Sequence, residues 1–236
     1  MQVPWIAPNA PGARREPLVL LLVLAAVLVW SGVAAADWRD WLLEISPVII
    51  GVPVLVWTYR GFPMTPLAYR LAFVLAVLLS IGAHFMFSRV PAGYWLERTL
   101  HLSRNPFDRI VHFTSGFAAA VLGRELLRRR TKLSDRWIFT IVAAGCLGGA
   151  ALYELLEWAA AVFNVDARAF VSTQGDRWDT QWDMLTTFAG ALVSLVGMAR
   201  VHDRQLRLFD RRALIRLARP DEGAGAVSGT RGGKAG

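Results

Sequence analysis

The sequence predicts an all-α protein, a polytopic membrane helix bundle with six transmembrane helices and both termini in the cytoplasm. Its 236 residues are 55% hydrophobic and only 19% charged, which is too apolar for a soluble domain of this length. The apolar residues also gather into segments of the ~20 residues that a helix needs to cross a bilayer. These segments are residues 18–36, 41–59, 67–87, 110–127, 137–163 and 182–201.

The distribution of basic residues predicts the orientation. With the N-terminus inside, 19 of the 26 Lys and Arg residues fall in cytoplasmic segments and seven fall outside, as the positive-inside bias requires. The net charge of +8 therefore reflects membrane orientation, because the basic residues follow apolar segments and do not form a phosphate-binding face on a soluble module. We expect a multi-pass protein of the bacterial inner membrane whose partner is the lipid bilayer, with no nucleic acid.

The two ends of the chain differ from its middle. Residues 1–17 lack periodicity and are predicted to form a disordered cytoplasmic arm before the six-span domain, residues 18–201. The first segment, 18–36, also resembles a secretory signal, since two arginines precede it and three alanines end it; we favour a retained helix. Residues 202–236 form a basic cytoplasmic tail, an amphipathic helix at first and disordered at its Gly/Ala-rich end.

The second to fourth segments follow in order. The second contains residues that membrane helices tolerate, namely Pro47, Gly51 and Pro53. The third carries His84 near its far end, and a longer loop with Tyr94 and Trp95, residues typical of membrane interfaces, precedes the fourth. The fourth begins just after Asp108 and holds His112 one turn inside.

The fifth and sixth segments flank the most polar stretch of the chain. The fifth contains Gly145, Gly148 and Gly149, small residues that would allow another helix to approach closely. It also carries Glu154 and Glu157 within an apolar span. The stretch 172–183 then leads directly into the sixth helix.

Acidic and histidine side chains concentrate at one end of this predicted bundle. In the predicted orientation they lie near the outer surface, whereas the cytoplasmic halves of the helices hold few. Spacings of three or four residues place pairs on one helix face. The residues are Glu44, His84, His101, Asp108, His112, Glu154, Glu157, Asp176, Asp179 and Asp183. Ionisable groups inside a membrane are costly and usually functional, so we expect them to converge on one pocket.

This set of side chains suits a divalent metal. Carboxylates and imidazoles favour zinc, manganese, iron or magnesium, and one cysteine, Cys146, cannot form a thiolate site. The predicted metal ligands are Asp108, His112, Glu154, Asp183 and Asp176. The predicted catalytic or supporting groups are Glu157, Asp179 and His84. A bound metal could generate a hydrolytic nucleophile from water.

Each candidate also has a structural interpretation. Thr180 and Asp183 fit a helix capping box, and the aspartates before them fit an N-cap. Glu154 or Glu157 could form an ion pair with an arginine of the neighbouring loops. A lone histidine such as His84 is more often hydrogen-bonded at an interface than catalytic.

Several motifs resemble those of the YjdF-like inner membrane proteins, a bacterial family without an assigned activity. The similarity extends over residues 41–199. Its motifs are Gly-Ala-His-Phe (82–85), Ser-Arg-Asn-Pro-Phe-Asp-Arg (103–109), Phe-Asp-Arg-Ile-Val-His-Phe (107–113), Tyr-Glu-Leu-Leu-Glu-Trp (153–158) and Thr-Gln-Gly-Asp-Arg-Trp-Asp-Thr-Gln-Trp-Asp (173–183). The resemblance implies a multi-span inner membrane protein and supplies no catalytic roles.

Three functions remain open from the sequence. The leading hypothesis is a metal-dependent enzyme that acts on a lipid or envelope substrate at the outer leaflet. A cation- or proton-coupled transporter is the second, although the inner halves of the helices offer few polar residues for a path. The third is a membrane scaffold whose polar cluster only joins helices.

Overall fold

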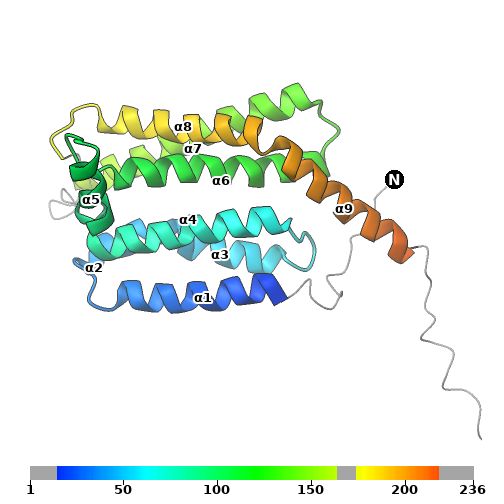
Figure 1. Ribbon diagram of the computed structural model, residues 1–236, viewed down its shortest axis with the longest axis horizontal. Helices are drawn as coiled ribbons and strands as arrows, with labels where there is room; N and C mark the ends of the chain where they lie inside the picture. The colour runs from blue at the N-terminus through cyan, green and yellow to red at the C-terminus, as the bar shows by residue number, and fades with distance from the viewer. Residues whose placement is uncertain (1–14, 164–173, 218–236) are drawn as a thin grey trace, which may run out of the picture.

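The structure, a computed structural model, describes residues 15–163 and 174–217 and is all-α over these ranges, which confirms the predicted class. Figure 1 shows the long helices lying side by side, with α5 across one end of the bundle and α9 leaving the other. The elements are α1 (Arg15–Gly32), α2 (Trp38–Glu44), α3 (Ser46–Thr58), α4 (Pro66–Phe85), the 3-10 helix η1 (Phe87–Arg89), α5 (Pro91–Thr99), α6 (Phe107–Arg130), α7 (Asp135–Phe163), α8 (Asp179–Gly197) and α9 (Ala199–Leu217).

Four of these helices, α1, α4, α6 and α7, are long and apolar enough to cross a membrane, and up to six spans result if each of two bent helix pairs is one span. The pairs are α2 with α3, bent by 44°, and α8 with α9, bent by 59°. The six predicted segments correspond to these elements in order, and their orientation stays a prediction. The predicted disorder of residues 1–14 and 218–236 lies outside the described residues, and α1 begins at Arg15, inside the predicted arm.

The second predicted span is broken, and its proline explains the break. Pro47 lies in the first turn of α3 and has no N–H to donate to the carbonyl four residues earlier. The hydroxyl of Ser46 instead donates to the carbonyl oxygen of Leu43 at 2.7 Å. The helix can therefore change direction at Ile45, which is fully buried, without leaving that carbonyl unpaired.

The helices bury small residues between them and turn large apolar residues outward. The cores between α6, α7 and α8 are built from side chains such as Ala120, Ala143 and Ala191. By contrast, Trp57 is 83% exposed and Val196 is 72% exposed. A soluble protein rarely leaves so many large apolar side chains in water, so these outward faces fit a lipid environment.

The closest helix contact joins α6 and α8 through two glycines. A methyl group added at Gly116 would overlap the carbonyl of Thr187, and one added at Gly190 would overlap the carbonyl of Phe113. Small residues allow membrane helices to approach at this distance. The sequence also allowed a close approach at the glycines of α7, but among the described residues no atom lies within 4 Å of a methyl group added at Gly145, Gly148 or Gly149.

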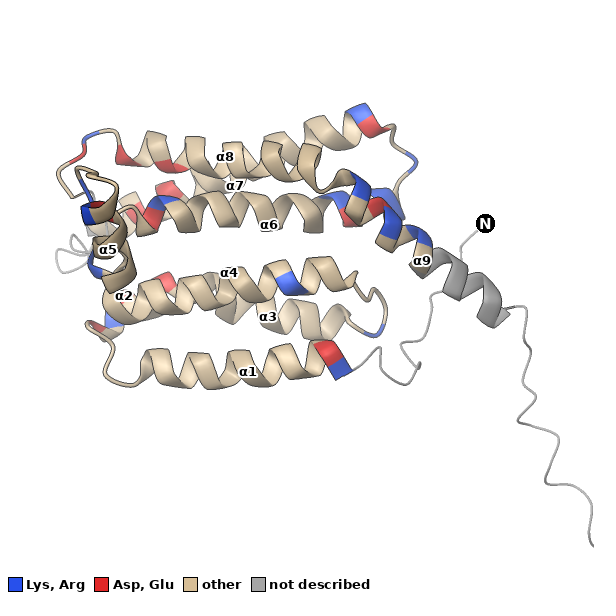
Figure 2. Cartoon of the chain, in the orientation of Figure 1, with Lys and Arg blue, Asp and Glu red and all other residues tan. Residues whose placement is uncertain are grey.

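A second polar cluster lies at the opposite end of α6 and corrects the expectation that this end would hold few ionisable groups. Glu125 is fully buried; its carboxylate accepts hydrogen bonds from the backbone N–H and hydroxyl of Thr65, at 2.9 and 2.7 Å, and from Arg129 at 2.9 Å. His202 of α9 lies with Nε2 3.1 Å from Glu125 and Nδ1 3.0 Å from Arg124. Figure 2 shows charged residues at both ends of the bundle.

This second cluster joins three elements. Arg124 also donates to Asp203 at 2.7 Å, and the backbone N–H of Leu67 donates to Gln205 at 3.0 Å. These bonds connect α6 to α9 and to the start of α4, and they connect α4 to α9. The cluster therefore anchors the beginning of α9 to the bundle.

We expect Gly190→Ala to destabilise the protein, because the added methyl group meets backbone and not a flexible side chain. The cost should be at least the roughly 1–3 kcal/mol of an overpacked core. Gly148→Ala is the matched control and should be neutral or stabilising, since alanine favours helix and the site is open. Thermal unfolding in detergent measures both; equal midpoints would contradict the proposed tight contact of α6 and α8.

We expect Glu125→Ala to lower the unfolding free energy by roughly 3–5 kcal/mol, because it leaves buried partners of a charged network unpaired. Asp135→Ala is the control: its partner Arg128 lies 2.6 Å away, but the aspartate is 76% exposed, and such surface pairs contribute about 0–1 kcal/mol. The same unfolding assay compares them. An equally mild effect of both variants would contradict the anchoring role.

Candidate functional site

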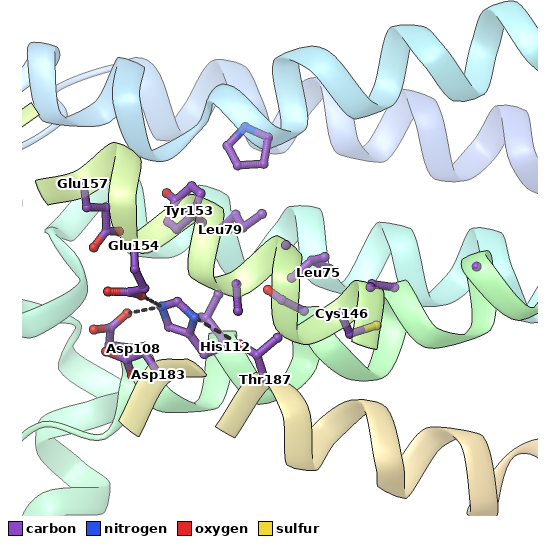
Figure 3. A pocket seen from close by; sticks show the side chains of 18 of the residues that line it. Leu75, Leu79, Asp108, His112, Cys146, Tyr153, Glu154, Glu157, Asp183 and Thr187 are labelled. Atoms are coloured by element: carbon purple, nitrogen blue, oxygen red, sulfur yellow. Dashed lines mark hydrogen bonds and ion pairs between the residues drawn. The ribbon is translucent and has the colours of Figure 1, made fainter. Parts of the chain in front are cut away.

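A cavity of about 510 Å³ opens among α2, α3, α4, α6, α7 and α8, with the acidic side chains at one end. Figure 3 shows this end, where Asp108, His112, Glu154 and Asp183 point toward one another and Glu157 lies above them. The rest of the wall is mainly apolar and extends along α6 to Leu126. The helices thus bring together residues that lie up to 143 positions apart in sequence, from Glu44 to Thr187.

His112 is at the centre of the acidic end. Its Nε2 lies 3.6 Å from Asp108 Oδ1 and 3.7 Å from Glu154 Oε1. Its Nδ1 lies 3.3 Å from the hydroxyl of Thr187. When Nδ1 carries the proton and donates it to Thr187, the lone pair of Nε2 faces the two carboxylates.

Three of these residues have the spacing of a metal site. One ligand atom each from Asp108, His112 and Asp183 can be chosen so that all three lie within 4.8 Å of one another. Asp183 is 3% exposed and Glu154 is 6% exposed, and each has a buried oxygen, Oδ1 and Oε1, without a hydrogen-bond partner among the described residues. Buried unpaired carboxylate oxygens are costly, so a cation or proton between them would lower the free energy of this arrangement.

Arg104 contacts two acidic residues of the cavity wall, although the sequence did not single it out. It forms an ion pair with Asp179 and lies 3.9 Å from Asp108 Oδ2. Burial is the largest effect and lowers the pKa of Arg104, but the hydrogen bond to Asp179 and the charges of Asp179, Asp108 and Asp183 together outweigh it, so the pKa is raised. Asp179 therefore lines the cavity as predicted, but it is neutralised by a neighbouring cation.

Asp176 does not line the cavity, so its predicted role as a metal ligand is not retained. Its Oδ2 accepts a hydrogen bond from Arg109 at 2.6 Å, and its Oδ1 accepts one from the backbone of Trp178 at 2.9 Å. The sequence left open that Glu154 or Glu157 pairs with Arg109, Arg168 or Arg177. Among the described residues, Arg109 instead pairs with Asp176, and Arg177 lies over the ring of Trp178. Arg168, another arginine of this loop, lies outside the described residues.

The predicted caps of the last membrane helix are also corrected. The N-cap of α8 is Trp178, which makes no side-chain capping bond. Thr180 therefore lies inside the helix and cannot form the predicted capping box with Asp183. Asp183 instead faces the cavity, which favours a functional interpretation over a structural one.

His84, a predicted catalytic group, does not line the cavity. Its Nδ1 lies 3.0 Å from the carbonyl oxygen of Ser31, and its ring stacks on Trp30 with centroids 4.5 Å apart. It therefore joins α1 to α4 and does not face the acidic cavity. His101, at a positive φ in an exposed loop, is also separate from the cavity.

Glu44 enters the cavity from the other side of the bundle. It is 5% exposed, and its Oε2 has no hydrogen-bond partner among the described residues. The sequence indicated it only as one acidic residue of the second span. A glutamate close to an apolar segment was the available signal for Glu44, whereas Glu125 lies among arginines and carried no such signal.

Two of the motifs hold the loops of the site together. The side chain of Gln174 accepts a hydrogen bond from the backbone of Asn105 at 3.0 Å and donates one to the carbonyl of Asn105 at 3.1 Å. Asn105 is fully buried and also donates to the carbonyl of Val90 at 3.0 Å. The pair fixes the loop before α6 beside the loop before α8, so it places Arg104 next to Asp179.

The fold and the site together define a multi-span helical membrane protein with a buried acidic and histidine cavity at one end of the helix bundle. More specifically, the chain belongs to a family of predicted membrane proteins, DUF2238, whose model matches residues 16–204. It is 41% identical over 199 residues to the inner membrane protein YjdF of Escherichia coli, covering 82% of this chain and 95% of that protein. This relative confirms the predicted family and inner-membrane location. No solved structure matches.

The pH dependence of stability tests the loop pair of Asp176. The backbone hydrogen bond from Trp178 and the charge of Arg109 hold the pKa of Asp176 below its ordinary value of 3.8. A lowered pKa stabilises the fold above pH 3.8, and the contribution disappears as the pH falls through the folded-state value. Asp176→Asn should therefore lower the unfolding midpoint at pH 7, and this decrease should shrink as the pH falls below 3.8. An equal decrease at pH 7 and below pH 3.8 would contradict an electrostatic role.

Proposed function

We propose that the acidic end of the cavity binds one divalent metal ion and that the protein is a metal-dependent enzyme acting on a lipid or envelope substrate. The ligands in this proposal are Asp108, His112 and Asp183, with Glu154 as a fourth. They come from three helices and meet below one membrane surface. The chemistry of oxygen and nitrogen donors suits zinc, manganese, iron or magnesium.

The spacing around His112 is the observation that supports a metal most directly. Hydrogen bonds between nitrogen and oxygen span about 2.7–3.2 Å, so the distances of 3.6 and 3.7 Å from Nε2 to Asp108 and Glu154 are too long for them. Two ligands that are each bound to one tetrahedral zinc ion lie roughly 3.3–3.6 Å apart. The side chains are thus spaced as ligands around an ion more than as partners of one another.

The surroundings of the ligands also support the proposal. Thr187 holds the far nitrogen of His112, and such contacts orient metal-binding histidines and raise their affinity. A bound divalent ion would activate water as a nucleophile or polarise an ester or phosphoryl oxygen. Asp179 is paired with Arg104, so we assign the role of general base to Glu157, which lines the cavity without belonging to the ligand set.

Transport has weaker support than catalysis. The cavity continues along α6 toward the second polar cluster, which would suit a path across the membrane. Its wall there consists of Gly123, Leu126, Leu127, Ile141 and Val142. Apolar walls neither relay protons nor replace the hydration of a cation, so a conducting path between the two polar clusters is missing among the described residues.

Metal analysis of the purified full-length protein tests the proposal. We expect one bound divalent ion, lost in His112→Gln and Asp183→Asn. The matched controls are His84→Gln and Asp176→Asn, which change the same residue types outside the cavity and should retain the metal. Thr187→Val should weaken binding by roughly 10–100-fold.

If the purified protein contains no metal, zinc, manganese, iron and magnesium are added in turn and the thermal unfolding midpoint is measured with each. A bound ion stabilises the folded state in proportion to its affinity. If none of these ions raises the midpoint and Asp183→Asn is as stable as the parent, the metal proposal is wrong and a scaffold role is favoured. Ion flux in vesicles that depends on Glu157 would instead favour transport.

A further inference from the structure

We infer that the cavity holds a bilayer lipid with an ammonium headgroup, with one hydrocarbon chain along α6 and α7 and the ammonium beside Glu44. This inference extends the proposed function by naming its substrate class, and it rests on that function for the chemistry but not for the binding. Glu44 takes no part in the proposed metal site. Its role and that of the apolar part of the cavity are therefore open to a separate test.

The apolar part of the cavity has the shape of a trough for a chain. Leu75 and Leu79 of α4 line it opposite Ile141 and Cys146 of α7. It follows α6 from His112 to Leu126, which corresponds to roughly 21 Å at 1.5 Å per residue. One leaflet of the hydrocarbon core is about 15 Å thick, so a lipid chain fits along the trough with its headgroup near the acidic end.

Two glycines of α7 keep this trough open. Gly145 and Gly149 line the cavity and are exposed, and a methyl group added at either position would meet no atom within 4 Å. No neighbouring helix among the described residues covers this part of the wall. A chain could therefore enter sideways from the bilayer, without leaving an apolar environment.

The acidic end favours a cationic headgroup. Glu44 is 5% exposed, lines the cavity and has an unpaired Oε2. Even with a doubly charged ion at Asp108, His112 and Asp183, the carboxyl groups of Glu44 and Glu157 remain. An anionic headgroup would meet these carboxylates, whereas a primary ammonium group offers three N–H donors to them.

Photo-crosslinking in detergent micelles tests the inference. The full-length protein is irradiated with a phosphatidylethanolamine that carries a diazirine on one acyl chain, and separately with the phosphatidylglycerol that carries the same chains. We expect the first lipid to label peptides of α6 and α7 about tenfold more strongly, as one charge-assisted hydrogen bond allows. Equal labelling, or stronger labelling by phosphatidylglycerol, would overturn the ammonium assignment.

Two variants and one control locate the binding. Gly149→Leu fills the trough and should abolish specific labelling, whereas Gly148→Leu, one residue away on an open surface outside the cavity lining, should leave it unchanged. Glu44→Gln should remove the preference between the two lipids. If both leucine variants label like the parent, the trough does not hold the chain, whatever happens to Glu44→Gln.

A chelator separates this inference from the metal proposal. Labelling that persists after metal removal, and that Gly149→Leu still abolishes, supports lipid binding even if metal analysis of the parent finds no ion. Loss of labelling in the chelator, with the metal-loaded protein labelled normally, would show that the headgroup binds through the ion and would overturn the role given to Glu44. Metal binding without any specific labelling overturns the inference and leaves the metal site standing.

Discussion

The close contact between α6 and α8 is the constraint on which the candidate site depends. Gly116 and Gly190 each let the backbone of the opposite helix come within contact distance. In a bilayer, helix association depends on such packing because lipid and apolar side chains offer similar surroundings. The contact places Asp183 beside His112 and puts Thr187 against the imidazole. A wider separation of the two helices would separate the ligands as well.

The helix α6 also connects two polar clusters that differ in how many of their buried carboxylate oxygens have a hydrogen-bond partner. At one end, Glu125 has partners for both carboxylate oxygens, including Thr65 and His202. At the other, Glu154 and Asp183 each keep an unpaired buried oxygen. A structural network gains most when every member is paired. The contrast therefore favours an anchoring role for the first cluster and a binding role for the second.

The loops at the acidic end are part of the site, since they fix its charge balance. Asn105 and Gln174 bind each other across two loops, and Arg104 then reaches Asp179. Without this arginine, Asp179 of α8 would lose its buried cation, and so would Asp108. The motifs that the chain shares with its family thus have a physical role in positioning, independent of any reaction.

Hydropathy, residue spacing and motifs determined the helical class, the six apolar segments, the family and the residues that could form a polar site, because these properties are local along the chain. The tertiary structure decided which of those residues meet. It joined Asp108, His112, Glu154 and Asp183, brought Glu44 and Arg104 to them, and left His84 and Asp176 with other partners. The tight helix contact also forms at Gly116 and Gly190 and not at the glycines of α7. Periodicity defines the helix face on which a side chain lies. Which helix packs against that face depends on residues far away in the sequence, so local patterns do not predict it.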